Sequence, residues 1–259
     1  MPIHPTAVVH ATASVHPTAD IGPYAIVGAN VTIGARTTVG AHAVLEGPAT
    51  IGEDNRICPL AALGGPPQDL KYKGEPTTLV IGNRNMFREF CTIHRGTVTG
   101  HGTTVIGDDN LFMAYAHVAH DCVVGNRTVF ANGASLAGHC IVEDDVILGG
   151  YAAVRQFLRI GRYAFVGAYS GMNRDVLPFL WSSTDRDVKA YKVNAVGLER
   201  KGFSKERVAA LQKAYRVLHR HRHDRAAMLA GLEELAKTSD DVKFLRDFIT
   251  SAKDGVHLP

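Results

Sequence analysis

The chain has 259 residues, of which 46% are hydrophobic and 20% are charged, and its formal net charge is +3. This composition is that of a folded globular protein, and the charge is too small to indicate nucleic-acid binding by itself. No run approaches the roughly 18 consecutive apolar residues that a membrane-spanning helix needs, and the first residues do not resemble a signal peptide. The four cysteines form no CxxC pair, so we expect free thiols and a cytoplasmic protein.

An apolar residue recurs at every sixth position through the first two-thirds of the chain. The series begins at Ile3, Val9 and Val15, shifts by one residue between Ile93 and Ile106, and continues to Met172. A helix of about 3.6 residues per turn cannot keep this period on one face, whereas a short strand followed by a tight turn can. Three six-residue units make one triangular coil of 18 residues, and we expect such coils to stack as a solenoid of parallel strands.

Two further columns accompany the apolar one. Glycine often follows the apolar residue directly, as at Gly22 and Gly34, and alanine often lies four positions after it, as at Ala19 and Ala25. We expect glycine to supply the unusual backbone angles at each corner, and alanine to fill the narrow core beside the larger side chain.

The repeat is interrupted twice and then stops. We expect residues 1–175 to form the β-helix, with excursion loops near 64–80 and 95–105, because neither segment has the pattern of a strand. Residues 176–259 are then expected to form a small C-terminal helical domain. Its helices are predicted over 205–220, 225–237 and 240–253, with Ser204 as the first N-cap.

Counting in steps of one coil places several polar residues on one edge of the solenoid. Eighteen residues after His120 is Gly138, beside His139, and eighteen more is Gln156, beside Arg155. Polar groups that converge on one edge indicate a cleft rather than scattered surface positions.

Asp121 directly follows His120 in this ladder. A carboxylate beside an imidazole can orient the ring and stabilise its protonated form, which suits a general base. His117 flanks the inward residue Val118 and can face the same edge. No serine or cysteine is placed as a nucleophile, so direct transfer without a covalent enzyme intermediate is the simpler mechanism.

Two other classes of protein remain open at this point. Three imidazoles on adjacent coils could bind zinc, and hexapeptide-repeat carbonic anhydrases are similar in outline. A repeat scaffold could also bind a ligand without turnover. The spacing of His120 and Asp121 favours a base with its orienting group over a metal site.

Six motifs together resemble the UDP-N-acetylglucosamine O-acyltransferase family. They are QDLKY at 68–72, IHRGT at 93–97, HVAHDC at 117–122, LAGH at 136–139, QF at 156–157 and GLERKGF at 197–203. The resemblance runs from the first repeat through the helical tail. It implies a left-handed parallel β-helix, which is an exception to the usual right-handed crossover.

The resemblance also implies an activity. The family's enzymes are homotrimers with active sites between subunits. They move an acyl chain, usually a 3-hydroxyacyl chain, from acyl carrier protein to the glucosamine 3-hydroxyl of UDP-N-acetylglucosamine in lipid A synthesis, and no metal or other cofactor is expected. N-acyl transfer to a 3-amino analogue of the sugar would need the same base and stays an alternative.

Site residues follow from the same resemblance. It makes His120 the general base, Asp121 its orienting partner and the Gly138 N–H the donor to the oxyanion. Contacts with the sugar nucleotide, its phosphates or the acyl-pantetheine are implied for Gln68, Asp69, Lys71, His117, His139, Gln156, Asn194 and Arg200.

Three positions depart from the family's pattern. Arg155 stands where the family commonly has histidine, so a substrate contact there would carry a fixed charge. Lys201 replaces a common arginine and loses the bidentate fork that suits phosphate. Ala168 occupies the position that limits acyl length, often glycine, and its methyl group would shorten the acceptable chain.

Basic residues are frequent after the repeat ends. They are Arg200, Lys201, Lys205, Arg207, Lys213, Arg216, Arg220, Arg222 and Arg225. Because acyl carrier protein is strongly acidic, we expect this surface to dock it.

Overall fold

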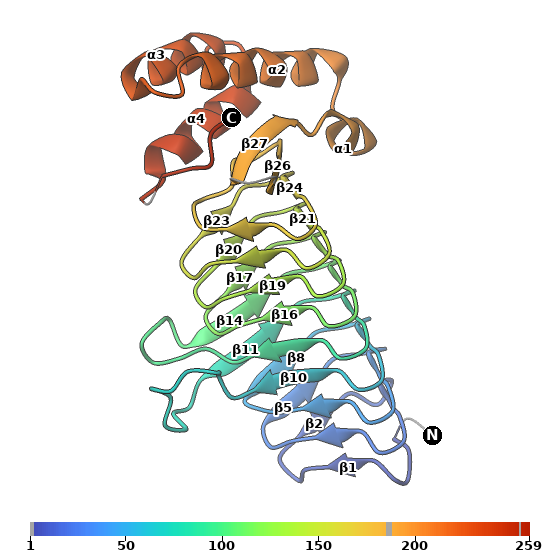
Figure 1. The fold of residues 1–259 in the computed structure, drawn as a ribbon. Coiled ribbons are helices and arrows are strands. Elements are labelled where there is room, and N and C mark those ends of the chain that lie inside the picture. Colours follow the sequence, from blue (N-terminus) through green and yellow to red (C-terminus); the bar gives the residue numbers. More distant parts are fainter. Residues whose placement is uncertain (1–2, 185–187, 254) are drawn as a thin grey trace.

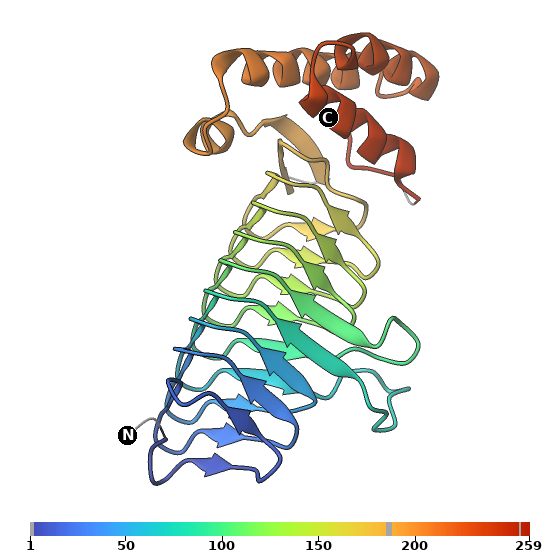
Figure 2. The same cartoon turned by 180° about the vertical axis from the view of Figure 1, so that it is seen from behind.

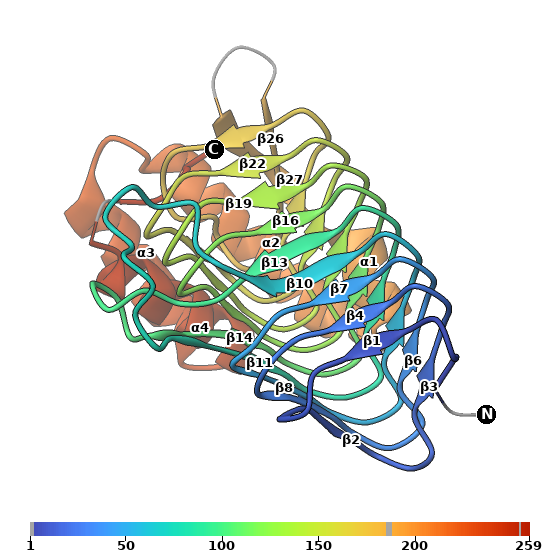
Figure 3. The same cartoon turned by 90° about the horizontal axis from the view of Figure 1, so that it is seen from below.

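The computed structural model describes residues 3–184, 188–253 and 255–259. Most of the chain winds into a left-handed β-helix shaped as a prism with three sides, and the helices cover its C-terminal end (Figure 1). The view from below shows the coils stacked around a common interior (Figure 3).

Each side of the prism is one sheet, and the strands within it are parallel except at one end. The first sheet contains β1 (Val8–Val9), β4 (Ile26–Val27), β7 (Val44–Leu45), β10 (Ala62–Gly65), β13 (Thr92–His94), β16 (His117–Val118), β19 (Ser135–Leu136), β22 (Ala153–Val154) and β25 (Gly171–Met172). The second contains β2 (Ser14–Val15), β5 (Val31–Ile33), β8 (Ala49–Ile51), β11 (Thr78–Ile81), β14 (Thr103–Ile106), β17 (Val123–Val124), β20 (Ile141–Val142) and β23 (Arg159–Ile160). The third contains β3 (Asp20–Ile21), β6 (Thr38–Val39), β9 (Arg56–Ile57), β12 (Met86–Phe87), β15 (Leu111–Phe112), β18 (Val129–Phe130), β21 (Ile147–Leu148), β24 (Phe165–Val166), β26 (Leu180–Thr184) and β27 (Val188–Val193).

Successive coils stack in register, with the apolar residue of each unit directed inward. Val118 pairs with Leu136, and Leu136 pairs with Val154, so one coil takes 18 residues. These three side chains are at most 3% exposed. The solenoid of parallel strands predicted from the six-residue period is confirmed.

The corners differ from the prediction about glycine. Positive φ occurs three residues after the inward apolar residue, at side chains such as Tyr24 (φ 57°) and Arg36 (φ 56°). Gly22 and Gly34 do not adopt positive φ, and a Cβ on Gly22 would lie 2.9 Å from the Val39 carbonyl oxygen. Glycine is therefore required by the close approach of stacked backbones, and the prediction that it supplies the corner angles is wrong.

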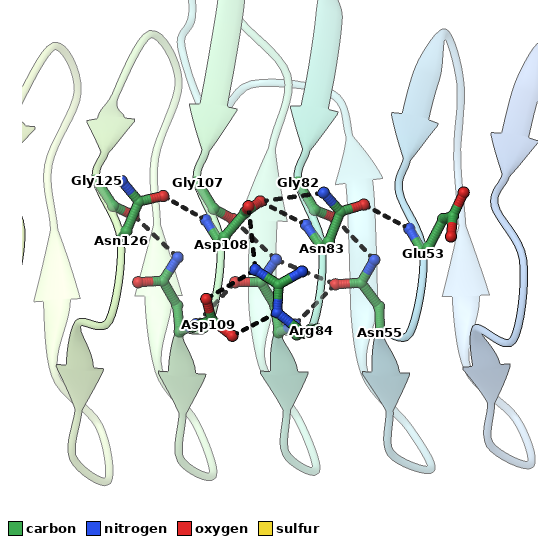
Figure 4. Close-up of polar contacts among 12 residues, drawn as sticks. Glu53, Asn55, Gly82, Asn83, Arg84, Gly107, Asp108, Asp109, Gly125 and Asn126 are labelled. Atoms are coloured by element: carbon green, nitrogen blue, oxygen red, sulfur yellow. Dashed lines mark hydrogen bonds and ion pairs between the residues drawn. The ribbon is translucent and has the colours of Figure 1, made fainter.

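Buried asparagines replace alanine at the corner between the second and third sheets. Asn55, Asn85 and Asn110 are each at most 2% exposed. The Asn85 amide nitrogen donates to Asn55 Oδ1 (3.0 Å) and to the Gly107 carbonyl (2.9 Å), and Asn85 Oδ1 accepts from the Asn110 N–H (2.9 Å). Figure 4 shows Asn55 of this column beside a second row of hydrogen bonds through Glu53, Asn83, Asp108 and Asn126, and Arg84 pairs with Asp108 and Asp109 there. The column satisfies backbone groups that the turns leave unpaired.

Two excursion loops leave the corner between the first and second sheets. The first spans 66–77 and the second 95–102, so both are shorter than the predicted 64–80 and 95–105. The difference arises because β10, β11 and β14 extend into residues that were predicted to be loop. There β10 pairs with β13, and β11 pairs with β14. Both loops project from the same edge of the prism (Figures 1 and 2).

The C-terminal helices pack on a second apolar core. They are α1 (Ala195–Arg200), α2 (Lys205–Arg220), α3 (Arg225–Ala236) and α4 (Asp240–Ser251). The Ser204 hydroxyl accepts the Arg207 N–H, as expected of the N-cap predicted for the helix over 205–220. Among the described residues, no helix is both long and apolar enough to cross a membrane.

The chain between the prism and the helices is not helical. Val176 still bridges to Ile160, and β26 pairs with β24 on one edge and with the antiparallel β27 on the other. The segment predicted to be a helical domain over 176–259 therefore begins with strands that extend the third sheet. The six-residue count could not detect them, because a hairpin has no such period.

Candidate active site

The predicted ladder lies at the corner between the first and second sheets, termed here the site corner. The turns that follow β16, β19 and β22 stack there, above the two excursion loops. A cleft of ≈ 430 Å³ opens at this corner. Its lining includes Gln68, His117, His120, Gly138 and Gln156, so the structure brings these predicted residues together.

The imidazole of His120 is held by the carboxylate of Asp121. Nδ1 of His120 lies 3.0 Å from Oδ2 of Asp121, and the two side chains are 14% and 0% exposed. A carboxylate only accepts hydrogen bonds, so Nδ1 of the neutral ring carries the proton and Nε2 keeps its lone pair. This is the tautomer that a general base requires.

Asp121 is buried yet ionised at neutral pH. Burial alone would raise the pKa of its carboxyl group, but hydrogen bonds from Thr97 and His120 outweigh burial and lower the pKa. The carboxylate therefore keeps its charge beside the imidazole.

Gly138 lies against the edge of the His120 ring. A Cβ there would lie 2.5 Å from Cε1 and 2.7 Å from Nε2 of His120. Among the residues that the structure describes, none accepts a hydrogen bond from the Gly138 N–H. A backbone donor is thus available beside the lone pair of the imidazole.

Two more imidazoles lie next to the cleft. Nδ1 of His117 is 2.8 Å from Thr92 Oγ1, and the His117 ring meets the ring of His94 edge to face, with centroids 5.0 Å apart. Burial, aided by neighbouring His117, His120 and Arg95, lowers the pKa of His94 to about 4. Burial also lowers the pKa of His117. Both rings are therefore neutral at physiological pH.

His139 occupies the coil after His120. Its ring stacks on Phe157 at a centroid distance of 4.5 Å, and its Nδ1 lies 3.8 Å from Asp121 Oδ2. Burial lowers the pKa of His139, while the charge of Asp121 opposes that change. Asp121 therefore faces three imidazoles: His120, which is hydrogen-bonded, and His139 and His101, whose Nδ1 atoms lie 3.8 Å and 4.0 Å from its oxygens.

Among the described residues, His120, Asp121 and His139 also form a group whose ligand atoms could surround a metal, all within 4.8 Å of one another. The hydrogen bonds argue against that use. Oδ2 of Asp121 accepts from the Thr97 N–H (2.9 Å), the Thr97 hydroxyl (2.6 Å) and His120 Nδ1. A metal on this oxygen would have to displace them, so the donor set fits a hydrogen-bonded base better than a metal centre.

The first excursion loop carries Gln68, Asp69 and Lys71. Gln68 lines the cleft, and the charge of Asp69 acts on His139. The Lys71 N–H donates to Asp69 Oδ1 at 2.9 Å, and its side chain is exposed. The loop thus brings the Gln68 amide to the cleft and leaves Lys71 exposed to solvent.

Arg95 anchors this loop, a role that the sequence did not reveal. Its guanidinium donates to the carbonyls of Gly64 (2.6 Å) and Gly47 (2.9 Å) and to the Tyr72 hydroxyl (3.2 Å). The only sequence signal was its place in the IHRGT motif, which also contains the unpredicted His94 and Thr97.

The remaining predicted residues lie away from the cleft within one chain. Ala168 is in the turn between β24 and β25, at the corner between the third and first sheets. Lys201 donates to Asp145 at 2.6 Å, at the corner between the second and third sheets. Asn194 is the N-cap of α1 and Arg200 is its last residue, and the Asn194 amide donates to the Tyr163 carbonyl (3.2 Å) at the same corner as Asp145.

Arg155 precedes Gln156 but does not line the cleft. Its backbone N–H donates to the Met172 carbonyl (3.0 Å), and its own carbonyl accepts from the Cys140 thiol (3.1 Å). All four cysteines are buried and unpaired, so the free thiols expected from the sequence are present.

Known proteins share this architecture and sequence. Residues 175–257 match a family model described as "Udp N-acetylglucosamine O-acyltransferase; Domain 2", and residues 103–138 match one of bacterial transferase hexapeptide repeats. The acyl-[acyl-carrier-protein]--UDP-N-acetylglucosamine O-acyltransferase of Verminephrobacter eiseniae (strain EF01-2) is 48% identical over 217 residues, which cover 82% of each chain.

Solved structures agree with this match. The UDP-N-acetylglucosamine O-acyltransferase of Moraxella catarrhalis RH4 is 43% identical, with a TM-score of 0.94 over 99% of both chains. The Francisella novicida UDP-N-acetylglucosamine acyltransferase is 35% identical, with a TM-score of 0.95 over 98% of this chain and 93% of its own. At this identity and coverage, the chain belongs to the UDP-N-acetylglucosamine O-acyltransferase family.

Proposed function

We propose that this protein transfers an acyl chain from acyl carrier protein to the glucosamine 3-hydroxyl of UDP-N-acetylglucosamine, the first step of lipid A synthesis. The substrates named for its relatives support this activity. One structural observation carries it: the Nε2 edge of His120 and the available N–H of Gly138 meet in one cleft. A base and an oxyanion donor side by side suit acyl transfer.

The chemistry follows from these two groups. Nε2 of His120 takes the proton of the sugar hydroxyl while that oxygen attacks the thioester carbon. The Gly138 N–H stabilises the negative oxygen of the tetrahedral intermediate. The C–S bond then breaks, the protonated imidazole returns its proton to the leaving thiolate, and Asp121 keeps the ring oriented throughout.

The positions of the other predicted residues support a homotrimer with active sites between subunits. His120, Lys201 and Ala168 lie at three different corners of the prism, so one chain cannot bring them into one site. A neighbouring subunit packed against the site corner could supply another corner and α1. Size-exclusion chromatography with light scattering tests the trimer, and a monomeric active enzyme would exclude it.

We propose that acyl carrier protein docks on one face of α2. Lys213, Arg216 and Arg220 are exposed there at spacings of three and four residues, whereas Lys201 and Arg207 are already paired with carboxylates. Reversing the three charges to Glu should raise the KM for acyl-[acyl-carrier-protein] and spare the KM for the UDP-sugar. Lys243→Glu on α4 is the matched control, and an unchanged KM in the triple variant excludes this face.

An assay with purified protein tests the activity and its alternatives. Acyl carrier protein thioesters of several lengths are offered with the 3-hydroxyl and the 3-amino UDP-sugar, with and without chelator. We expect O-acyl transfer that resists the chelator and collapses in His120→Ala. Transfer only to the amino sugar would identify an N-acyltransferase. Binding without turnover would identify a ligand-binding scaffold, and loss of activity with chelator would identify a metalloenzyme. Retained activity in His120→Ala would contradict the proposed role of His120 as the general base.

The protein is proposed to need no cofactor and to work in the cytoplasm. The four unpaired buried thiols support the second point, because a reducing compartment keeps such thiols free. Adding metal ions to chelator-treated enzyme should leave the rate unchanged.

A further inference from the structure

The second excursion loop, residues 95–102, folds onto the carboxylate of Asp121. The Thr97 N–H donates to Oδ2 at 2.9 Å and the Thr97 hydroxyl donates to the same oxygen at 2.6 Å. The Gly102 N–H donates to Oδ1 at 3.0 Å. Together with His120, the loop gives each carboxylate oxygen at least one donor. Two more imidazoles face the carboxylate: Nδ1 of His101, in the same loop, lies 4.0 Å from Oδ1, and Nδ1 of His139 lies 3.8 Å from Oδ2.

The direction of the Thr97 hydroxyl is determined by its neighbours. A hydroxyl has a single proton, and the carboxylate can only accept it. Thr99 Oγ1, 3.0 Å from Thr97 Oγ1, must then be the donor in that second contact. The hydrogen bonds run from Thr99 through Thr97 to Asp121, where they meet the proton on His120 Nδ1 from the other side.

The loop is shaped to bring its backbone against this carboxylate. A Cβ on Gly100 would lie 2.4 Å from Cγ of Asp121, so a side chain there would displace the carboxylate. The N–H groups of Gly100 and Gly102 both lie 3.1 Å from the Thr97 carbonyl, which closes the loop into a tight turn. Thr97 itself is 2% exposed, so water does not compete for the contact.

We propose that Thr97 is a positioning residue that acts through Asp121 on the imidazole of His120. This inference rests on the proposed role of His120 as the base. Two effects follow from the geometry. The hydroxyl limits where Oδ2 can lie, and it draws negative charge from the oxygen that holds the imidazolium.

Thr97→Val tests the hydroxyl because it keeps the backbone N–H and nearly the same shape. Losing one donor leaves more charge on Oδ2 for the imidazolium, so the acidic limb of the kcat/KM profile should move to higher pH by about half a unit. A less restrained carboxylate should also lower kcat by about tenfold, with the KM for the UDP-sugar nearly unchanged. Thr97→Ser restores the donor and should return both values.

Thr103→Val is the matched control in the same loop region. The Thr103 hydroxyl bonds to Thr78 and does not contact Asp121. This variant should keep the acidic limb of the wild type. Equal pH profiles in Thr97→Val, Thr103→Val and wild type would overturn the proposal, as would a Thr97→Ser enzyme that behaves like Thr97→Val.

A measurement without turnover separates this inference from the role of His120 in catalysis. The titration midpoint of His120, followed by NMR of the histidine-labelled protein, should move upward in Thr97→Val and stay in place in Thr103→Val. That shift would support the role of Thr97 whether or not His120→Ala keeps activity. Activity in His120→Ala would contradict only the proposed role of His120 as the base. No shift would overturn the proposal.

Discussion

A Cβ atom on Gly138 would lie 2.5 Å from Cε1 of His120, one coil earlier in the solenoid. Real Cβ atoms almost never approach this closely, so the imidazole has the position it does because residue 138 has no side chain. The stacking of coils thereby couples the proposed base to the backbone N–H proposed to stabilise the oxyanion.

Gly138→Ala should therefore displace the ring while leaving the fold intact. The added methyl group would push the imidazole from Asp121 and crowd the backbone donor, and kcat should fall by about 100-fold. Gly171→Ala, whose Cβ would meet no atom within 4 Å, is the control and should keep full activity. Steady-state kinetics and circular dichroism measure the two effects. Wild-type kcat in Gly138→Ala would show that the ring can move without loss.

His94 should make the folded state sensitive to acid. Its pKa is lowered from 6.5 to about 4, mainly by burial. As the pH falls through that window, the unfolded chain binds a proton that the folded chain does not, so the free energy of unfolding should decrease by on the order of 3 kcal/mol. His94→Phe should lose less stability across the same window in urea unfolding at fixed protein concentration.

The exposed His42 provides the control for this measurement. His42→Phe should follow the wild-type pH dependence. A His94→Phe curve parallel to the wild type would mean that the buried ring contributes nothing to acid sensitivity.

Arg95 should control the first excursion loop. Arg95→Ala removes the hydrogen bonds to the carbonyls of Gly64 and Gly47 and to the Tyr72 hydroxyl, and leaves the two part-buried carbonyls without a charged donor. We expect faster proteolysis within 66–77 and a KM for the UDP-sugar raised by about tenfold. Arg88→Ala, which removes an exposed pair with Glu89, should change neither. Protection equal to wild type in Arg95→Ala would refute the anchoring role.

The asparagine column should be a strong determinant of stability. Asn85→Ala leaves the Asn110 N–H and the Gly107 carbonyl without these bonds in a buried corner, while Asn55 Oδ1 keeps only the backbone N–H of residue 85. The free energy of unfolding should fall by about 3 kcal/mol. Asn132→Ala, at an exposed turn, should change it by less than about 0.5 kcal/mol. Similar decreases in the free energy of unfolding in both variants would show that the asparagine column does not contribute more to stability than an exposed turn.

The β-helix and part of the site could be predicted from the spacing of residues along the sequence. The six-residue period predicts the coil, and the coil length places His120, Gly138 and Gln156 together, because a solenoid relates residues by simple addition. The hydrogen bond between His120 and Asp121 could also be predicted, because the two residues are neighbours in the chain. The hairpin of β26 and β27 was missed, because neither strand belongs to the repeat.

Residues at constant or minimal separation along the chain could be placed from the sequence, whereas contacts of the excursion loops and of the C-terminal segment could not. The sequence determined the repeat, its register and the His120–Asp121 pair, since each depends on residues at constant or minimal separation. The tertiary structure decided that Thr97 clamps Asp121 from 24 residues away and that Lys201 bonds to Asp145 at another corner. Residues in loops outside the repeat are not related by the 18-residue coil, so their contacts depend on three-dimensional packing alone.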